Sequence, residues 1–358
     1  GEGGASFKGD LALVYKANIC LRTAVRVLFF LAEAPVDSDE ALYEFASSID
    51  WSNYMTPDHT LMVDSNVRDS NLTHSQFTSQ KIKDAICDQF VEKDGRRPSV
   101  DKENPLVKIN FHLSNNHGVI SLDSSGDSLH KRGYRPKQWK APLNEALAAG
   151  LIQLAGWNSS LTFWDPMCGS GTLAIEAALL ATNKRPGLFR MNYSFMHVLG
   201  YDEEVFFTER RLLKDQSVKI IDFEIIATDI SADAVDIARK NAQTAGVDQL
   251  ITFKVCDFAE TPVPSTPGVI MFNPEYGERL GVHTKLEATY KRMGDFMKQE
   301  AKGYRGYIFT GNPDLAKRIG LRASRRVEFY NGKLDCRLLE YELYEGSRRE
   351  SPDAAPLA

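Results

Sequence analysis

The sequence predicts an α/β protein in which a small mixed domain precedes a mostly parallel sheet that ends in an antiparallel hairpin. From residue 141 onwards, apolar strands alternate with helices, which is typical of a parallel sheet with helices on both faces. Near the end, "RRVEFYNGKLDCRLLEYELY" reads as two strands around Asn331-Gly332, a hairpin signal. A chain of 358 residues also has the length of two domains.

Residues 1–125 are expected to form the smaller domain. "LVYKANICLRTAVRVLFFL" has helical spacing, and residues 73–93 read as a long amphipathic helix. "LVKINFHLS" and "HGVISLDSS" read as two strands joined by Asn115-Asn116. The chain begins abruptly at "GEGGASFKGD", so we expect further residues of this domain ahead of Gly1.

The rest of the chain divides into three predicted segments. Residues 126–140 form a basic linker, residues 141–345 the larger domain, and residues 346–358 a disordered tail. Residues 182–219 interrupt the strand–helix alternation with a long aromatic and basic excursion. Such an excursion is either a functional insertion or a packed surface loop.

The composition excludes several classes of protein. Hydrophobic residues make up 43% and charged residues 25%, as in ordinary globular proteins, and no apolar run approaches the roughly 18 residues that cross a bilayer. The five cysteines are scattered and form no CxxC pair, so neither a metal site nor a disulfide framework is indicated. We expect no membrane partner and a reducing, cytoplasmic location.

A basic run, "SLHKRGYRPKQWK" at residues 128–140, holds five cations and no acid. A solvated linker is the usual explanation of such a run. Here aromatic residues alternate with the cations, and aromatic faces stack on bases while cations neutralise phosphates. The predicted RNA-binding residues are Lys131, Arg132, Tyr134, Arg135 and Lys137.

A glycine-rich stretch, "DPMCGSGT", lies between a predicted strand and a predicted helix. Glycines there let the backbone approach a ligand, and the helix N-terminus presents free N–H groups. The lack of a Lys argues against a Walker-type phosphate loop, whereas a dinucleotide G-x-G-x-x-G loop is matched loosely, with Ala174 in the last position. The candidate ligand-binding residues are Asp165, Pro166, Met167, Cys168, Gly169, Ser170, Gly171 and Thr172.

The next two predicted strands also end in acids, Asp229 in "IIATDIS" and Asp257 in "KVCDF". Each acid could instead cap a helix. Asp229 could accept two hydrogen bonds from a ribose diol, and Asp257 could bond the exocyclic amine of adenine, with Phe258 beside the ring. Because ligands of open α/β sheets bind at the carboxyl ends of strands, three successive strands that end in Asp favour a nucleoside site.

The fourth strand ends in Asn273-Pro274-Glu275-Tyr276. In order, "DPMCGSGT", "TDIS", "CDF" and "NPEY" resemble the class I S-adenosylmethionine-dependent methyltransferases that methylate amines through an Asn-Pro-Pro-Tyr motif. Over nearly the whole chain, "GGASFKGD", "LRTAVRVL", "DSSGDSLHKRGYRPKQWKAPLNEALAAGLIQLAGW", "NPEYGERLG" and "NGKLDCRLLEYEL" resemble the THUMP-domain guanine-N2 methyltransferases of large-subunit ribosomal RNA.

This resemblance implies a Rossmann-like class I methyltransferase domain with a mostly parallel seven-stranded sheet, preceded by a THUMP domain and part of a ferredoxin-like segment. It implies S-adenosylmethionine as cofactor and ribosomal RNA of the pre-ribosomal large subunit as partner. We expect a monomer. Besides the glycine-rich stretch, the implied cofactor-binding residues are Asp229, Ile230, Asp257, Phe258 and a closing segment with Pro142 and Leu143, which equally suits the first turn of a helix.

The resemblance assigns methyl transfer to Asn273, Pro274 and Tyr276. The Asn side-chain oxygen and the Pro carbonyl accept the two amine hydrogens and aim the lone pair at the sulfonium methyl, while the Tyr stacks on the extruded base. Glu275 departs from the family pattern, which has a second Pro there. The lost backbone restriction weakens preorganisation by about 0.4–1 kcal/mol, so we expect a weakened site rather than a dead one.

Three other functions remain open on the sequence alone. Methylation of a protein glutamine in a release factor uses the same motif, but a mixed α/β front domain and "HKRGYR" disfavour it. DNA adenine methylation is the second. The third is a non-catalytic RNA-binding module with a relic of a methyltransferase site, which Glu275 favours and the intact polar residues disfavour.

Overall fold

The structure, a computed structural model, describes residues 3–136, 143–261, 263–264, 266–275, 283–332 and 334–344, with residues 283–285 as backbone only. The chain forms two compact units. The first comprises residues 1–133 and 184–217, and the second comprises residues 134–183 and 218–358. The excursion after the first predicted helix of the larger domain therefore belongs to the first unit, and the change of unit near residue 133 falls inside the predicted basic linker.

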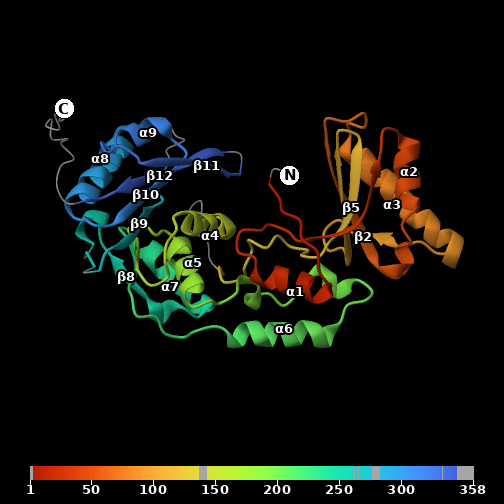
Figure 1. Ribbon diagram of the computed structural model, residues 1–358, viewed down its shortest axis with the longest axis horizontal. Helices are drawn as coiled ribbons and strands as arrows, with labels where there is room; N and C mark the ends of the chain where they lie inside the picture. Colours follow the sequence, from red (N-terminus) through yellow and green to blue (C-terminus); the bar gives the residue numbers. More distant parts are fainter. Residues whose placement is uncertain are drawn as a thin grey trace, which may run out of the picture. The chain divides into compact units, whose positions relative to one another are not determined.

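The first unit contains a five-stranded sheet in the order β1-β5-β4-β2-β3. β2 is parallel to β3 and β4, whereas β5 is antiparallel to β1 and β4. Helices α2 and α3 lie side by side against this sheet, and α1 packs beside α6 (Figure 1). The elements are α1 (Leu11–Cys20), β1 (Leu28–Pro35), α2 (Asp39–Ser47), η1 (Trp51–Asn53), β2 (Thr60–Arg68), α3 (Ser75–Asp94), β3 (Ser99–Val100), β4 (Val107–Ser114), β5 (His117–Asp123), η2 (Pro186–Phe189), η3 (Ser194–His197) and α6 (Glu203–Asp215).

Two local signals in this unit are confirmed and one is wrong. The helix predicted over residues 73–93 is α3, which ends at Asp94 and is capped by Gly95 with φ of 65°. The predicted turn at Asn115-Asn116 joins β4 to β5 with φ of 51° and 57°. The helical spacing of "LVYKANICLRTAVRVLFFL" gave a wrong prediction for the second half of this stretch. The helix ends at Cys20, and a strand begins at Leu28. Pairing of that strand with β5 overrides the local pattern.

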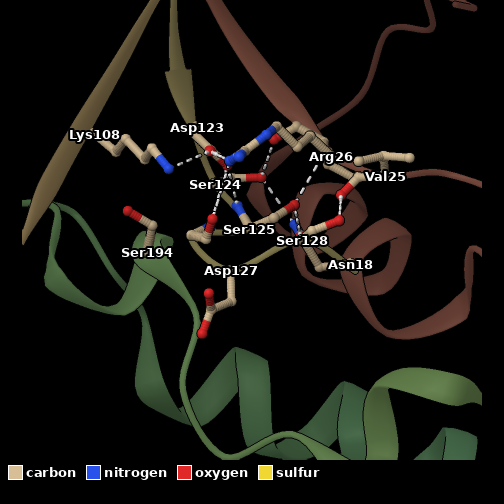
Figure 2. A network of polar contacts seen from close by, with 12 residues as sticks. Asn18, Val25, Arg26, Lys108, Asp123, Ser124, Ser125, Asp127, Ser128 and Ser194 are labelled. Atoms are coloured by element: carbon tan, nitrogen blue, oxygen red, sulfur yellow. Dashed lines mark hydrogen bonds and ion pairs between the residues drawn. The ribbon is translucent and has the colours of Figure 1, made fainter. Parts of the chain in front are cut away.

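A buried polar network ties the end of β5 to the rest of the first unit (Figure 2). Asp123 is 2% exposed, forms ion pairs with Arg26 and Lys108, and accepts hydrogen bonds from the backbone N–H groups of the two residues that begin the next turn. Asn18 of α1 exchanges hydrogen bonds with Ser124 and Ser125 at 2.8 and 2.6 Å. A charge this deeply buried is tolerated because it is both paired and hydrogen-bonded.

The excursion contributes an aromatic and arginine layer to the same unit. Tyr193, Phe195 and Phe206 are buried against Tyr15 of α1. Arg190 donates to the backbone carbonyls of residues 125, 127 and 128 and lies 4.8 Å over the ring of Tyr193. The sequence left open whether the excursion is a functional insertion or a packed surface loop. The structure shows that it packs, with its aromatic side chains buried inside the first unit.

The second unit is built on a seven-stranded sheet in the order β11-β12-β10-β9-β6-β7-β8. Strands β6 to β10 are parallel, and β12 is antiparallel to both β10 and β11, as the hairpin signal predicted. The elements are α4 (Glu145–Leu154), β6 (Thr162–Asp165), α5 (Thr172–Ala181), β7 (Ile225–Asp229), α7 (Ala232–Ala245), η4 (Asp248–Leu250), β8 (Ile251–Val255), η5 (Phe258–Glu260), β9 (Gly268–Phe272), α8 (His283–Gln299), β10 (Arg305–Thr310), α9 (Pro313–Lys317), β11 (Arg325–Asn331) and β12 (Leu334–Glu342).

The strand order reverses at β6, the central strand from which the chain moves first to β7 and β8 and later to β9 and β10. Loops that follow β6 and its neighbours diverge there, which is where open α/β sheets bind ligands. Within the part of the chain that the structure describes, no helix is long and apolar enough to cross a membrane.

Candidate functional site

Four sequence-predicted site residues follow adjacent parallel strands at the carboxyl edge of the sheet. Asp165 ends β6, Asp229 ends β7, Asp257 follows β8 by two positions, and Asn273 follows β9. The strands are in register, with Asp165 level with Ala227 and Asp229 level with Val255. The structure therefore brings these residues to one edge, as their positions in the sequence predicted.

The glycine-rich stretch makes a tight loop that its own backbone holds in place. The N–H of Cys168 donates to the Thr228 carbonyl of β7 at 2.9 Å, and the N–H of Gly171 donates to the Cys168 carbonyl at 2.7 Å. Gly171 has φ of 80°, and a Cβ there would lie 2.9 Å from the Cβ of Ala238 in α7. Glycine is thus required at 171 both by its backbone conformation and by the close approach of α7.

Asp229 fastens this loop from the neighbouring strand. Its Oδ2 accepts a hydrogen bond from the N–H of Gly169 at 2.9 Å, and its Oδ1 accepts one from the N–H of Ser231 at 2.9 Å. The helix-cap role that competed for Asp229 is taken by Ser231, whose Oγ accepts from the N–H of Ala234 in α7. Since a carboxylate offers about four acceptor positions, Asp229 can still accept hydrogen bonds from a ligand.

Asp165 is a buried carboxylate without a well-formed partner. Its side chain is 1% exposed, and neither oxygen accepts a hydrogen bond of good geometry from the described residues. Burial, and secondarily the charge of Asp229, raises its pKa to about 8, although the backbone N–H groups of Met167 and Ala174 lower it in part. An unsatisfied buried carboxylate is costly, so a cationic or hydrogen-bond-donating ligand group beside it would be stabilised.

The third acid differs from the sequence expectation in its surroundings. Asp257 accepts from the N–H of Ala259 at 2.9 Å, which caps η5, and forms an ion pair with Arg292 at 2.8 Å. Phe258 is 5% exposed and packs edge-on against Phe272 and Phe296. The ring of Phe258 therefore belongs to the core under β9 and is not exposed at the edge, whereas the sequence suggested an open position beside a ligand ring.

A different apolar side chain is presented at this edge. Ile230, directly after Asp229, is 73% exposed. An isoleucine of that exposure next to a polar loop is able to cover the face of a flat ring. Among the members of the loop, Cys168 is buried, and burial raises the pKa of its thiol well above the usual value, which argues against a nucleophilic role.

The Asn-Pro motif stands where β9 ends. Pro274 is buried, Asn273 is half-buried, and Glu275 is exposed. The Glu275 carbonyl accepts a hydrogen bond from Tyr290 Oη at 3.4 Å, and the same hydroxyl lies 2.8 Å from Thr310 Oγ1 at the end of β10. Tyr290 of α8 thereby connects the Asn-Pro motif to β10, the strand next to β9. Tyr276 lies outside the described residues.

Three of the residues predicted to bind RNA, Arg132, Tyr134 and Arg135, have buried side chains, which differs from the expectation that they face RNA. Arg132 is 1% exposed and donates to the carbonyls of Leu129 and Arg22 in the first unit. Tyr134 is fully buried and donates to Glu176 in α5 at 3.0 Å. Both side chains are occupied by internal contacts, so they are not available to nucleic acid.

Arg135 has a structural position beside the glycine-rich loop instead. Its guanidinium donates to the Leu143 carbonyl at 2.8 Å and to Thr172 Oγ1 at 2.9 Å, and it lies 3.5 Å from a carboxylate oxygen of Glu145. It therefore joins the segment before α4 to the first residue of α5. Of the predicted RNA-binding residues that the structure describes, Lys131 is the exposed one, and its ammonium pairs with the Asp127 carboxylate at 3.3 Å. Lys137 and Pro142 lie outside the described residues.

Sequence reasoning missed Asn241. This side chain of α7 is fully buried, and its Nδ2 donates to the Ser170 carbonyl of the glycine-rich loop at 3.1 Å. The signal was an Asn seven residues after Ala234 and three after Ala238, on the otherwise apolar face of the helix. A polar residue at such a position usually has a specific partner. No cluster of three or more potential metal ligands occurs among the described residues.

Three family models match successive parts of the chain. The RMKL-like methyltransferase domain matches residues 132–340, the THUMP domain residues 36–123, and the RlmL ferredoxin-like domain residues 1–28. A Synechocystis sp. protein, named as a candidate RNA methyltransferase, is 38% identical over 341 residues, which are 95% of this chain and 89% of that protein.

The large-subunit ribosomal RNA methyltransferase K/L of Syntrophotalea carbinolica is 39% identical over 353 residues, which are 96% of this chain and 49% of that protein. The chain thus spans about half the length of the K/L relatives it matches. A crystal structure of a methyltransferase complexed with S-adenosylhomocysteine is similar with a TM-score of 0.84 and 29% identity, over 95% of this chain and 89% of that one.

These similarities confirm the class I methyltransferase fold, with its mostly parallel sheet, THUMP domain and ferredoxin-like segment. They also confirm the S-adenosylmethionine-dependent class that the motifs indicated. Since the methyltransferase model covers more than half of the chain and a relative matches 95% of it at 38% identity, the chain belongs to the RMKL-like methyltransferases that carry a THUMP domain.

Proposed function

We propose that this chain transfers a methyl group from S-adenosylmethionine to the exocyclic N2 of a guanine in large-subunit ribosomal RNA. The observation that carries the proposal is the shared edge of three neighbouring strands, where Asp165 ends β6, Asp229 ends β7 and Asn273 follows β9. The K/L relatives are named for their action on large-subunit ribosomal RNA, which supports RNA as the substrate. A monomeric, cytoplasmic protein that acts on the pre-ribosomal large subunit belongs to the same proposal.

The residues at the edge fit S-adenosylmethionine. The unsatisfied carboxylate of Asp165 suits a donor-rich, cationic group such as the ammonium of a methionine moiety. Asp229 suits a ribose diol through its remaining acceptor positions, and the exposed Ile230 suits the face of an adenine. When bound, the cofactor supplies an electrophilic methyl on a sulfonium. Asp257 retains a partly exposed carboxylate, 22% by side chain, for the adenine amine.

The Asn-Pro motif supplies the acceptors that a guanine amine needs. The amine is a poor nucleophile, because its lone pair is delocalised into the ring. The side-chain oxygen of Asn273 and the carbonyl of Pro274 would accept its two hydrogens and orient the lone pair. Burial of Pro274 and the hydrogen bond from Tyr290 to the next carbonyl hold this backbone at the strand end. Stacking of Tyr276 on the extruded base completes the proposal from the sequence.

The decisive measurement is methyl transfer from radiolabelled S-adenosylmethionine to unmodified large-subunit ribosomal RNA, followed by mass spectrometry of the nucleosides. We expect N2-methylguanosine from the parent protein. Asn273→Ala should abolish transfer while RNA affinity remains nearly unchanged, because the Asn oxygen matters chiefly as the amine reacts. Label in adenine, in DNA or in a protein glutamine would replace the proposed substrate, and absence of transfer to any of them would favour the non-catalytic alternative.

A further inference from the structure

Cations gather on the second unit at the segment that joins α9 to β11. Residues 317–326, "KRIGLRASRR", contain five cations and no acid. Lys317 pairs with Asp314 at 2.8 Å and Arg318 with Glu287 at 3.2 Å, both at exposed positions. Arg322 and Arg326 are exposed and form no ion pair with any residue that the structure describes. Their charge is therefore not neutralised locally.

A cavity of about 310 Å³ opens beneath this segment, between α9 and the β11–β12 hairpin. We call it the α9–hairpin cavity. Its charged lining is Lys317, Arg326, Arg337 and Asp335, and its apolar lining includes Leu321, Ala323, Leu339 and Tyr341. The mixture of cations with apolar and aromatic side chains suits a ligand that combines anionic groups with flat rings.

The alternation of side chains along the β11–β12 hairpin determines which cations lie on the face that lines the cavity. Arg326, Glu328 and Tyr330 alternate along β11 and lie on one face. The cross-strand neighbours of these three residues are Leu339, Arg337 and Asp335, which all line the cavity. Arg325 falls on the opposite face of the strand and is excluded. Tyr330 is 70% exposed at the end of β11, which leaves its ring open to stacking.

The cavity reaches the edge at which the Asn-Pro motif stands. Thr310, one of its lining residues, ends β10 and has Arg337 as its antiparallel partner. β10 runs parallel to β9, with Ile308 level with Phe272, so Thr310 is level with Pro274. Tyr290 Oη contacts both Thr310 and the Glu275 carbonyl. From β9 to β11 is three strand spacings, about 14 Å.

We propose that the α9–hairpin cavity binds the phosphodiester backbone of the RNA strand beside the target nucleotide. The phosphate contacts are Lys317 and Arg326 of the cavity lining and Arg322, an exposed residue next to the lining residues Leu321 and Ala323. The proposal rests on the proposed function, because it takes the Asn-Pro motif as the place of the target base. Guanidinium groups match phosphate oxygens in two-point hydrogen bonds, and the exposed pairing of Lys317 with Asp314 costs little to exchange. Arg337 lines the cavity but already forms ion pairs with Asp335 and Glu328, so it is not one of the proposed phosphate contacts.

The test compares two triple variants that remove the same charge from the same unit. The test variant is Lys317→Gln, Arg322→Gln and Arg326→Gln. The control is Lys240→Gln, Lys298→Gln and Lys302→Gln, which are exposed lysines near the C-terminal ends of α7 and α8 or just after α8. Because these helices return toward the amino ends of the strands, the control lies away from the motif.

Binding of unmodified large-subunit ribosomal RNA is measured over a range of salt concentrations. At about 0.7 per single-strand phosphate contact, the slope of log K against log salt should fall by about 2 in the test variant and stay near the parent value in the control. S-adenosylmethionine affinity and thermal stability should be equal in all three proteins. The KM for RNA in methyl transfer should rise in the test variant with kcat unchanged.

The possible results separate this proposal from the proposed function. Equal slopes for the test and control variants would overturn the cavity proposal even when methyl transfer to RNA is found. A reduced slope together with methylation of another substrate would keep the RNA contact and overturn the proposed function. Guanosine monophosphate provides a third arm. If it binds the parent but not the test variant in calorimetry, while the RNA salt slopes of the two proteins are equal, the cavity is a site for a free nucleotide and the RNA proposal is wrong.

Discussion

The carboxylate of Asp229 and the backbone N–H of Gly169 are joined by a hydrogen bond of 2.9 Å, although the two residues are 60 positions apart in the chain. The bond connects the end of β7 to the loop that follows β6, across the two strands at which the sheet order reverses. One carboxylate thereby shapes the loop and remains open to a ligand.

Asp229→Ala should weaken binding of S-adenosylmethionine severely. The substitution removes the anchor of Gly169 and the acceptors for a ribose diol, at a cost of roughly 1–3 kcal/mol per hydrogen bond to a charged group. Calorimetry measures the affinity. The control is Asp233→Ala, an exposed acid in the first turn of α7, which should bind like the parent. Equal affinities in the two variants would contradict the assignment of Asp229.

Asp165→Asn should stabilise the cofactor-free protein at high pH. Since the folded-state pKa of Asp165 is raised to about 8, the folded protein keeps this carboxyl protonated while the unfolded chain ionises near pH 4. The contribution of the Asp165 carboxyl to the free energy of unfolding is thus fully present below about pH 4. It is lost progressively as the pH rises to about 8. The advantage of Asn should grow over that window and then level off.

Thermal unfolding of parent and Asp165→Asn at pH 5, 6.5 and 8 measures this difference. The same variant should bind S-adenosylmethionine more weakly, because an amide, unlike the carboxyl, cannot ionise beside a cationic ligand group. A melting-temperature difference that does not depend on pH would show that the carboxyl is not the titrating group.

Glu275→Pro should leave methyl transfer unchanged or make it faster. Glu275 is exposed and only its backbone carbonyl has a described contact, with Tyr290, so the side chain can be replaced without losing packing. A Pro at this position restricts Pro274 and restores about 0.4–1 kcal/mol of preorganisation. The rate of label transfer to RNA is the measurement, and Glu275→Ala controls for loss of the charge alone. A sharp fall in Glu275→Pro that Glu275→Ala shares would give the carboxylate a role of its own.

Arg135→Gln and Lys131→Gln should have opposite effects, although the sequence grouped them. Breaking the buried contact of Arg135 with Glu145 should destabilise the protein by about 3–5 kcal/mol and leave the salt dependence of RNA binding unchanged. Lys131 is exposed, so its replacement should preserve stability and flatten the salt dependence if it contacts a phosphate. Urea unfolding and salt titrations of RNA binding distinguish them. A reduced salt slope for Arg135→Gln would restore its RNA-binding role.

Local sequence predicted the edge at which the site forms and several elements, although it missed the end of α1 at Cys20 and the strand that begins at Leu28. The period of the apolar residues predicted α3, the Asn-Gly pair predicted the β11–β12 hairpin, and acids at strand ends predicted where Asp165 and Asp229 would meet. These features depend on backbone preferences and on the alternation of strands with helices, both of which are encoded within about ten to thirty residues. The loop from Asp165 to Thr172 was recognisable for the same reason.

Tertiary packing decided which side chains of a motif are buried and which are exposed. Phe258 and Arg135 stand in motifs that suggested adenine and RNA, yet the first packs on Phe272 and the second joins Leu143 to Thr172. Likewise, the excursion from residue 184 to 217 packs with residues 1–133 because its aromatic side chains are buried against α1. These partners lie from 8 positions away, for Arg135 and Leu143, to 180 positions away, for Tyr15 and Phe195. No local pattern specifies which of them will exclude water from a given side chain.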